Sequence, residues 1–404
     1  MDRKGNGIEV NKKVLMIAQY FPPAGSVGTL RIAKFVKYLK EFGWQPVVLT
    51  VLKECYPTAV WLDTDLNKDV PDDVHIYRTN IWRSSFINDE GIRWLPFLLR
   101  NIFKIIRKER PNLIYIVGGP FFPLIVGPIV KLFFRLPYVV DLRDPWRTAR
   151  VYQPSRGLKS RISRVLTSIL EPIVFRFATK VICVTKTMLK EYLSVYPQHK
   201  KKFLVITNGY DPEDFINLKA KKYKKFTIAY TGKFRRTEAF HNPEPIFQAI
   251  KILRNMETDI QLIHVGAIEQ EVIELVKKIG IENTIKFVGP KVHKEALNYA
   301  KGADLLLVIG SDRKMGLPVK MFDYIGCQRP ILILAYEDEE LTKILGGISW
   351  VKLIQNKDPQ IIADTIMEFY KTKFLVSRTD NIGKCYERKY LTNTLAQVFD
   401  KAIL

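Results

Sequence analysis

Short apolar runs separated by amphipathic stretches recur along the whole chain. The first runs lie at residues 13–18, 46–51 and 113–117, and between the first two, apolar residues recur at helical spacing from Leu30 to Leu39 until Gly43. Buried parallel strands read as nearly continuous Val, Ile and Leu runs, so this order predicts β-α-β units and an α/β fold. Further strands are expected at 138–142, 180–185 and 203–207.

A polar segment at residues 211–225 divides two such series. The second series predicts strands at 226–230, 261–265, 285–288, 304–309 and 330–334, and helices at 244–254, 269–279, 293–301 and 319–326. We therefore predict two doubly wound, Rossmann-like parallel-sheet domains, at 1–216 and 217–378. Such sheets bind ligands beyond the carboxyl ends of their strands, so we expect the two domains to face a central cleft.

Charge narrows the choice of partner. The 404 residues include 64 Lys and Arg against 41 Asp and Glu, a net charge of +23, which favours a phosphate ligand, an anionic membrane or nucleic acid. Residues 91–202 hold 22 of the basic residues and only 5 acidic ones. The four Cys and five His have no metal-ligand or redox spacing, so the sequence predicts no metal and favours a reducing cytosol.

Two basic, apolar stretches lie in this region. Residues 94–110 and 159–176 combine bulky apolar residues with Lys and Arg, which is typical either of a helix in a membrane interface or of an outer helix that packs its apolar stripe on the sheet. Uncharged residues 112–130 contain too many Gly and Pro for a membrane span and read as a strand, a loop and a helix start. The polar start at residues 1–11 shows no export signal.

Three motifs can contact an anion or a sugar nucleotide. A loop with Gly25, Ser26 and Gly28 precedes the first helix, where backbone N–H groups favour negative charge, although a plain tight turn is an equal alternative. Residues 231–236, TGKFRR, follow a strand with cations suited to a diphosphate. A third segment, 316–331, places Lys320 and Asp323 on one helical face, a cation for phosphate beside a carboxylate for sugar hydroxyls.

The order of these motifs resembles that of a known family. FPPAGSVG (21–28), DLRDPW (141–146), TNGYD (207–211), YTGKF (230–234) and KMFDYIGCQRPIL (320–332) together resemble the GT-B glycosyltransferases of family 4, group 1, over nearly the whole chain. The resemblance implies a metal-independent glycosyl- or hexosyltransferase with no cofactor beyond its nucleotide-sugar substrate. It also implies that residues 379–404 form a helix crossing back to the first domain.

Site residues follow from the same resemblance. It implies that Lys233 neutralises the pyrophosphate leaving group and that Asp323 holds a ribose hydroxyl. Asp144 is a speculative catalytic residue, for which a capping or salt-bridging carboxylate is the equal alternative. The expected donor-binding residues are Gly25, Ser26, Gly28, Lys233, Arg235, Arg236, Lys320 and Asp323, with Asn208, Asp141 and Arg143 as further cleft residues.

Departures from the family leave other readings open. Met315 stands where the family has the first acid of its E-x7-E element, Ala239 stands where a second basic residue is usual, and the usual cleft His is missing, so a catalytically impaired relative is one alternative. A basic nucleic-acid-binding protein is another, although no helix-turn-helix, RNP or zinc pattern supports it. Asp63 and Asp65 form a D-x-D, which we attribute to chance.

The favoured interpretation is an enzyme of polysaccharide biosynthesis. It is expected to move a sugar, with retention, from a nucleotide-diphosphate donor to a polysaccharide or lipid-linked acceptor. We expect a cytoplasmic protein, peripheral on the inner face of the plasma membrane, that binds an anionic lipid surface and no nucleic acid.

Overall fold

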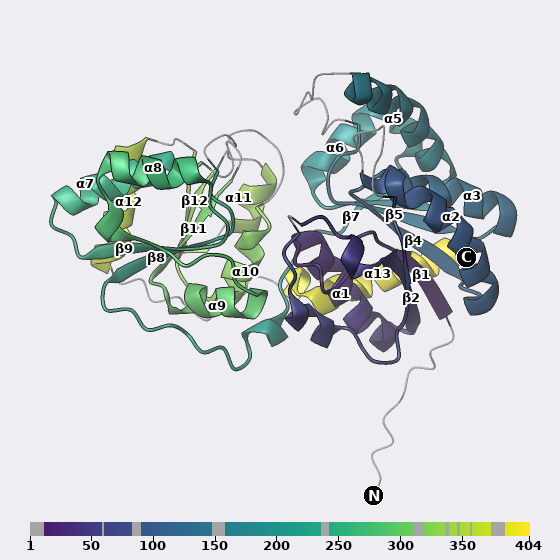
Figure 1. Cartoon of the computed structure of the whole chain (residues 1–404), viewed down its shortest axis with the longest axis horizontal. Coiled ribbons are helices and arrows are strands. Elements are labelled where there is room, and N and C mark those ends of the chain that lie inside the picture. The colour runs from purple at the N-terminus through teal and green to yellow at the C-terminus, as the bar shows by residue number, and fades with distance from the viewer. Residues whose placement is uncertain are drawn as a thin grey trace, which may run out of the picture. The chain divides into compact units, whose positions relative to one another are not determined.

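The computed structural model divides the chain into two compact units. The first comprises residues 1–208 and 388–404, and the second residues 209–387. The structure describes residues 12–58, 60–82, 90–147, 158–235, 242–310, 318–335, 339–345, 348–355, 358–372 and 384–404, without the side chains at 27, 159, 160, 339 and 343. The boundaries at 208 and 387 lie eight and nine residues from the expected 216 and 378, and the two units are described separately below (Figure 1).

The first unit is built on a seven-stranded sheet. Its order is β3-β2-β1-β4-β5-β6-β7, and all neighbouring strands are parallel. The order reverses direction beside β1, as in doubly wound folds, so the predicted α/β class is confirmed. The strands are β1 (Lys12–Ile17), β2 (Trp44–Val51), β3 (His75–Thr79), β4 (Leu113–Gly118), β5 (Tyr138–Leu142), β6 (Lys180–Cys183) and β7 (Phe203–Val205).

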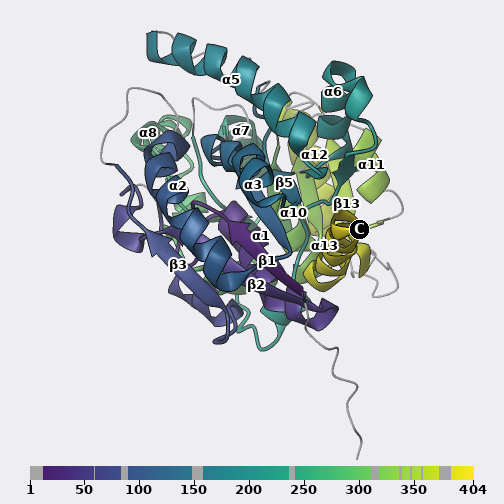
Figure 2. The ribbon, with the colours of Figure 1, turned by 90° about the vertical axis from the view of Figure 1, so that its right-hand side faces the viewer.

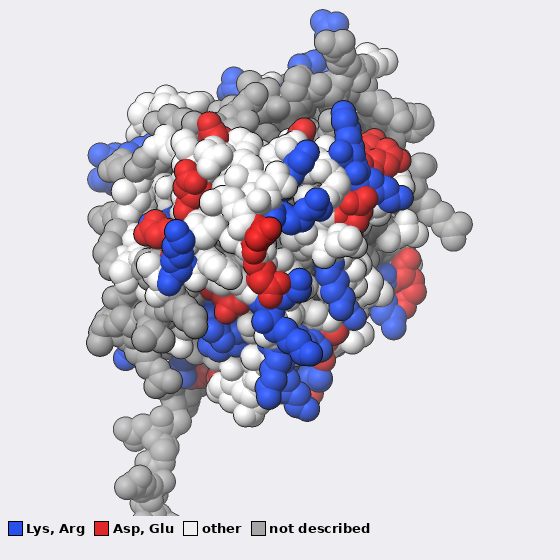
Figure 3. All heavy atoms as spheres, turned by 90° about the vertical axis from the view of Figure 1, so that its left-hand side faces the viewer, with Lys and Arg blue, Asp and Glu red and all other residues white. Residues whose placement is uncertain are grey.

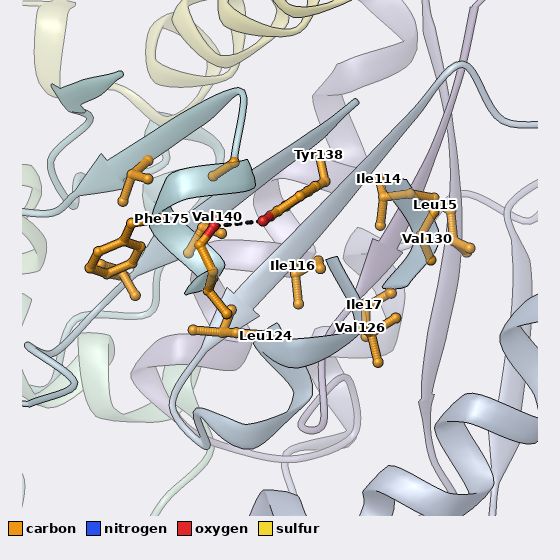
Figure 4. Packing of buried hydrophobic residues seen from close by; sticks show 14 of the residues in the cluster. Leu15, Ile17, Ile114, Ile116, Leu124, Val126, Val130, Tyr138, Val140 and Phe175 are labelled. Carbon is orange, nitrogen blue, oxygen red and sulfur yellow. Dashed lines mark hydrogen bonds between the residues drawn. The ribbon is translucent and has the colours of Figure 1, made fainter. Parts of the chain in front are cut away.

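Helices cover both faces of this sheet. On one face, Leu15, Ile116 and Val140 pack with residues of α2, α3, α5 and α6 in one buried cluster, part of which is drawn in Figure 4. On the other face, Val14 and Met16 pack with α1 and α13. The helices are α1 (Val27–Leu39), α2 (Glu90–Glu109), α3 (Val126–Phe134), α5 (Leu158–Phe177), α6 (Lys186–Val195) and α13 (Arg388–Ile403).

The last helix belongs to the first unit although it lies at the end of the chain. Leu395 and Phe399 of α13 are buried, and Phe399 contacts Trp44 with ring centroids 5.3 Å apart. Trp44 also donates its indole N–H to Asp400 at 3.0 Å. The α13 helix thus closes the face that α1 leaves partly uncovered, and Figure 2 shows it beside the sheet.

The second unit repeats this plan with six strands. Its order, β10-β9-β8-β11-β12-β13, is again parallel throughout. Helices α7, α8 and α12 pack on one face and α9, α10 and α11 on the other. The elements are β8 (Phe226–Thr231), α7 (Glu244–Asn255), β9 (Ile260–Val265), α8 (Gln270–Ile279), β10 (Ile285–Phe287), α9 (His293–Gly302), β11 (Leu305–Ile309), α10 (Lys320–Cys327), β12 (Ile331–Leu334), α11 (Glu339–Leu345), β13 (Val351–Ile354) and α12 (Pro359–Thr372).

The two basic, apolar stretches differ in how their apolar sides are buried. The apolar side of α2 is buried, with Trp94, Leu98 and Ile102 inside the core, so α2 is an outer helix of the sheet. The outward side of α5 is different and is described below. Residues 112–130 form β4, a short 3-10 turn and the start of α3, as expected, and no described helix is long and apolar enough to cross a membrane.

A buried ion pair holds the carboxyl end of the first sheet. Arg31 of α1 donates from Nε to Asp141 Oδ2 at 2.9 Å and from Nη2 to Oδ1 at 3.1 Å, and both side chains are almost fully buried. Tyr115 of β4 donates its hydroxyl to the same carboxylate. Arg31 also donates to the carbonyls of Ile206 and Thr207 at 2.9 and 2.6 Å, so one guanidinium connects α1 with β5 and with the chain that follows β7.

Replacing Asp141 by Asn is expected to destabilise the first unit strongly. The change leaves the buried Arg31 charge without a counter-charge, which costs about 3–5 kcal/mol of unfolding free energy. Urea unfolding of the full chain measures the loss. The control is Asp73→Asn, because Asp73 pairs with Lys40 at the surface and is expected to cost below about 1 kcal/mol. Equal losses for the two variants would contradict the role given to Asp141.

Candidate functional site

Two glycines bring the loop after β8 close to the end of β9. Gly232 has φ +128° and Gly266 φ +154°, values that favour glycine. A Cβ at Gly266 would lie 1.9 Å from the Gly232 carbonyl oxygen, and the Gly232 N–H donates to Val265 at 2.7 Å. The loop that carries the basic motif is therefore held against the carboxyl end of the second sheet.

Stacked aromatic side chains pack against this loop. Phe234 is fully buried and stacks on Tyr230 and His264, with ring centroids 4.4 and 4.2 Å away. His264 donates Nε2–H to the Gly232 carbonyl at 2.8 Å. Burial lowers the pKa of His264 to about 4 against the opposing effect of that hydrogen bond, so the imidazole is neutral at physiological pH and adds no second cation.

Lys320 lies beside the same loop. It stands at the start of α10, and its Nζ donates to the Tyr230 hydroxyl at 2.8 Å and lies 4.0 Å from the centroid of the Tyr230 ring. A Cβ at position 232 would come within 2.2 Å of that Nζ, so Gly232 makes the space that the ammonium occupies. The Tyr230 hydroxyl in turn donates a hydrogen bond to the Lys233 carbonyl oxygen at 3.1 Å.

No acidic group among the described residues pairs with Lys320. Desolvation by the surrounding protein therefore lowers its pKa to about 7 without an opposing carboxylate. A cation held this way gains free energy when an anion binds next to it, because the anion supplies the missing counter-charge. The second unit thus carries a site that is suited to phosphate.

The other predicted cations of this loop differ in availability. Lys233 is exposed at the loop tip, with its side chain directed to solvent rather than into the core. Arg235 is half-buried and forms an ion pair with Glu269 at 3.5 Å. Arg236, Ala239 and Met315 lie outside the described residues. The structure therefore brings Lys320 and the backbone of Lys233 together, and it ties Arg235 to an acidic residue.

Asp323 lies one helical turn after Lys320. It is half-buried, and its Oδ2 is 3.3 Å from His293 Nε2 at the start of α9. The histidine fixes one carboxylate oxygen, and a carboxylate has a second oxygen that can accept a hydroxyl. Lys320 and Asp323 thus lie in the first turn of the same short helix, as the spacing in the sequence predicted.

In the first unit, the predicted loop forms the amino-terminal end of α1. Ser26 is the N-cap and accepts from the Thr29 N–H at 3.2 Å. Arg143 reaches back over Gly28, where a Cβ would lie 1.1 Å from its Nη1, and donates to the Gly118 and Gly119 carbonyls. Desolvation lowers the pKa of Arg143, which remains charged, so a cation lies beside the positive end of α1.

The remaining predicted residues of this unit separate into buried and exposed ones. Asp141 is fully buried in its pair with Arg31, so its carboxylate is part of the interior and does not line the surface. The Gly25 N–H is taken by the Trp61 carbonyl at 2.6 Å and is not offered to an anion. Asn208 is half-buried just after the carbonyls that Arg31 holds, and Asp144 is exposed.

The D-x-D of the first unit has local roles. Asp63 caps a short 3-10 turn by accepting from the Asp65 N–H at 3.1 Å, and Asp65 pairs with Lys68 at 2.6 Å. These contacts agree with a chance occurrence of the motif.

Two doubly wound parallel-sheet units in one chain are the architecture of the GT-B class. The first unit matches the family model "Glycosyltransferase Family 4" over residues 30–214, and the second matches "Glycosyl transferases group 1" over residues 225–372. The chain therefore belongs to the family 4, group 1 glycosyltransferases, which combine these two domains.

Solved structures support the fold. HepE from Anabaena, in complex with UDP and glucose, is 16% identical and has a TM-score of 0.67, covering 96% of this chain and 100% of that one. A sucrose-phosphate synthase from Thermosynechococcus elongatus is 14% identical with a TM-score of 0.71, covering 97% and 99%. A putative UDP-N-acetylglucosamine 2-epimerase from Listeria monocytogenes is 13% identical with a TM-score of 0.64, covering 97% and 96%. No curated protein matches the chain significantly.

Sequence reasoning missed the residues that hold the site together. In the sequence, Tyr230 is recognisable only as part of a motif, and His264 and His293 carry no pattern of their own, although each contacts a predicted residue or its loop. The Tyr324 hydroxyl, which accepts a hydrogen bond from the Thr231 N–H at 2.8 Å, also lies inside one of the family motifs. A tyrosine that follows an apolar run and precedes a glycine was the available signal.

Replacing Lys320 by Met is expected to stabilise the protein at pH 7. The buried ammonium has a pKa below that of the unfolded chain, so its charge opposes folding, and its removal should raise the unfolding free energy by about 1–3 kcal/mol. This gain in stability should shrink as the pH rises from 7 toward 10. In that range the wild-type lysine folds in its neutral form, and the free energy needed to remove its proton falls as the pH approaches the pKa of an exposed lysine. Thermal melts across this range measure it.

The matched control for this measurement is Lys251→Met. Lys251 is an exposed lysine of α7 in the same unit, and its replacement should leave the melting temperature nearly unchanged at every pH. A lower melting temperature for Lys320→Met at pH 7 would show that the lysine stabilises the fold instead of serving a ligand.

Proposed function

We propose that this glycosyltransferase takes its sugar from a nucleoside-diphosphate donor bound at the Gly232 loop and α10 of the second unit. The observation that carries the proposal is the Lys320 ammonium, which is desolvated beside Tyr230 and is not paired with a described carboxylate. A structural lysine is normally given a counter-charge or left in water, because an unpaired buried charge is costly. A diphosphate provides the missing charge.

The similar structures support the same class of donor. The HepE structures are described with UDP and with UDP-glucose, and the putative epimerase is named for a UDP-sugar. Epimerases share the fold, so the fold alone does not select sugar transfer. The match to two glycosyltransferase family models favours transfer for this chain.

Each residue of the site has a distinct task in this proposal. Lys320 and Lys233 stabilise the charge that builds up on the departing diphosphate, which is where electrostatic catalysis acts. Asp323 accepts a ribose hydroxyl while His293 holds its other oxygen. His264 and Tyr230 position the loop and the lysine. Two cations can neutralise the leaving group without a metal or other cofactor, which we also propose.

The acceptor and its location form a second part of the proposal. We infer that the first unit receives a polysaccharide or lipid-linked acceptor near the amino-terminal end of α1, where Arg143 provides positive charge. We propose transfer with retention, in which the leaving phosphate takes the acceptor proton, at the cytoplasmic face of the membrane. No protein nucleophile is needed for this course, and Asp144 stays an exposed candidate for contact with the acceptor.

UDP is expected to bind the wild type and to raise its melting temperature, by RT ln(1 + [L]/Kd) in free energy, whereas duplex DNA should not.

Lys320→Ala should weaken UDP binding roughly tenfold to a hundredfold, because a charge-assisted contact is lost, and Asp323→Ala should abolish release of nucleotide diphosphate from a sugar nucleotide. Calorimetry measures binding, and a panel of sugar nucleotides measures release. Lys251→Ala is the control. Unchanged UDP binding by Lys320→Ala would contradict the assignment of Lys320 to the donor site.

Binding of the donor is also expected to depend on pH through Lys320. With a pKa of about 7 in the free protein, Lys320 must take up a proton to meet the diphosphate above that pH. The affinity for UDP-glucose, whose diphosphate keeps its charge, should therefore fall by up to about tenfold per pH unit above 7. Lys320→Arg should bind with no such dependence, since arginine stays protonated. A wild-type affinity that is constant from pH 7 to 9 would contradict the desolvated lysine.

A further inference from the structure

Helix α5 is apolar on two opposite sides. Toward the sheet it buries Val174 and Phe175, and Leu170 packs against the same core. This inward side alone would anchor the helix, as a single apolar stripe does in a surface helix. The side that faces away from the core is also apolar.

The outward stripe follows helical spacing along the whole length of α5. Its members are 73% exposed at Leu158 and 54% exposed at both Val165 and Ile169, and residues at intervals of three or four lie on one face of a helix. The complete stripe consists of Leu158, Ile162, Val165, Ile169, Ile173 and Phe177. Elsewhere in the described parts of the chain, exposed large apolar side chains occur singly or in pairs along the sequence.

The neighbouring helix extends this apolar area. Lys131 of α3 donates to the Phe177 carbonyl at 3.0 Å, so the carboxyl end of α3 adjoins the carboxyl end of α5. There Leu132 and Phe133 of α3 are 76% and 65% exposed. Figure 2 shows α5 at the outer edge of the first unit. We call the α5 stripe together with Leu132 and Phe133 the α5–α3 surface.

The exposed charged side chains described on α5 and at the end of α3 are all basic. Arg161, Arg164 and Arg176 are exposed on α5, and Arg135 is exposed at the end of α3. The acidic residue of α5 is Glu171, which is buried and accepts from Tyr196 at 2.8 Å. On the face of the second unit in Figure 3, by contrast, basic and acidic side chains are interspersed.

We propose that the α5–α3 surface docks on an anionic lipid bilayer, with the apolar stripe in the headgroup and acyl boundary and the arginines against lipid phosphates. An apolar face with a basic border is the composition that interfacial helices use. Residues 94–110 have that composition too, but the structure buries their apolar side. The lipid-facing part of the chain is therefore α5 and α3, not α2.

A second copy of the chain fits this surface less well. A symmetric dimer places the same patch against itself, so it would bring the arginines of the two copies together. Like charges facing each other across an interface oppose association, whereas anionic phosphates neutralise them. The charge pattern thus selects lipid as the occupant.

Flotation with vesicles tests the proposal on the full chain. Vesicles of equal parts phosphatidylglycerol and phosphatidylcholine should carry the wild type upward in low salt, and phosphatidylcholine alone should carry far less. The triple variant Ile162→Ser, Val165→Ser, Ile169→Ser should reduce binding at least tenfold, since each buried aliphatic side chain contributes about that factor or more. Arg161→Gln with Arg164→Gln should reduce it roughly fivefold for each arginine and weaken its salt dependence.

Controls come from α12 of the second unit. Ile361 is 43% exposed and Lys371 is exposed, so Ile361→Ser with Lys371→Gln removes matched side chains elsewhere and should leave vesicle binding unchanged. All the altered residues are at the surface, so melting temperatures should stay within a few degrees of the wild type. UDP binding by the variants should also be unchanged, which keeps the outcome separate from the donor site.

Two results would overturn the proposal. Absence of flotation by the wild type in low salt would rule out lipid as the occupant, whatever the donor experiments show. If sedimentation instead finds a dimer that the triple variant dissociates, while its flotation equals that of the wild type, the α5–α3 surface is an interface between copies. Loss of flotation in the triple variant alone, with the α12 variant unaffected, supports docking on lipid.

Discussion

Both units depend on a desolvated positive charge at the carboxyl ends of their strands, and the two units compensate this charge differently. In the first, Arg31 is neutralised by Asp141 and fixes the chain after β7, so the charge becomes part of the framework. In the second, the Lys320 ammonium contacts the hydroxyl and ring of Tyr230 and pairs with no acidic group of the described residues. A buried pair ties elements together, whereas a buried unpaired cation stores free energy that an incoming anion can release.

The neutral surroundings of Lys320 are as important as the lysine. His264 would repel the ammonium if it were protonated, but burial between Phe234 and Phe287 keeps it neutral, and its N–H holds the Gly232 carbonyl instead. Gly232 and Gly266 remove the Cβ atoms that would push the loop away. The Lys320 ammonium therefore stays without a counter-charge among the described residues, beside a neutral histidine and a closely approaching backbone.

The parts of the fold that were predictable are those in which burial dictates residue type. Central strands such as β4 and β11 are covered on both faces, so they are continuous apolar runs and were recognised from the sequence. The edge strands β3 and β13 were missed, because half of each faces solvent and polar residues such as Arg78 and Lys352 interrupt the pattern. That Lys320 and Asp323 share one helical turn was predictable because helical spacing is local. Tyr230 and His264, in contrast, are brought together by the pairing of β8 with β9.

Residues 94–110 and 159–176 show that the exposed side of a helix is as hard to predict from the sequence as a long-range contact. Both stretches alternate apolar and basic residues, and composition alone cannot tell which apolar side meets the sheet. Helix α2 has one apolar side, and the core takes it, as with Trp94 and Leu98. Helix α5 carries apolar residues around most of its circumference, so packing on one sheet uses Phe175 and leaves Ile169 outside. A helix that is apolar on more sides than its own domain can cover needs a second apolar environment, and the arginines beside it indicate which one.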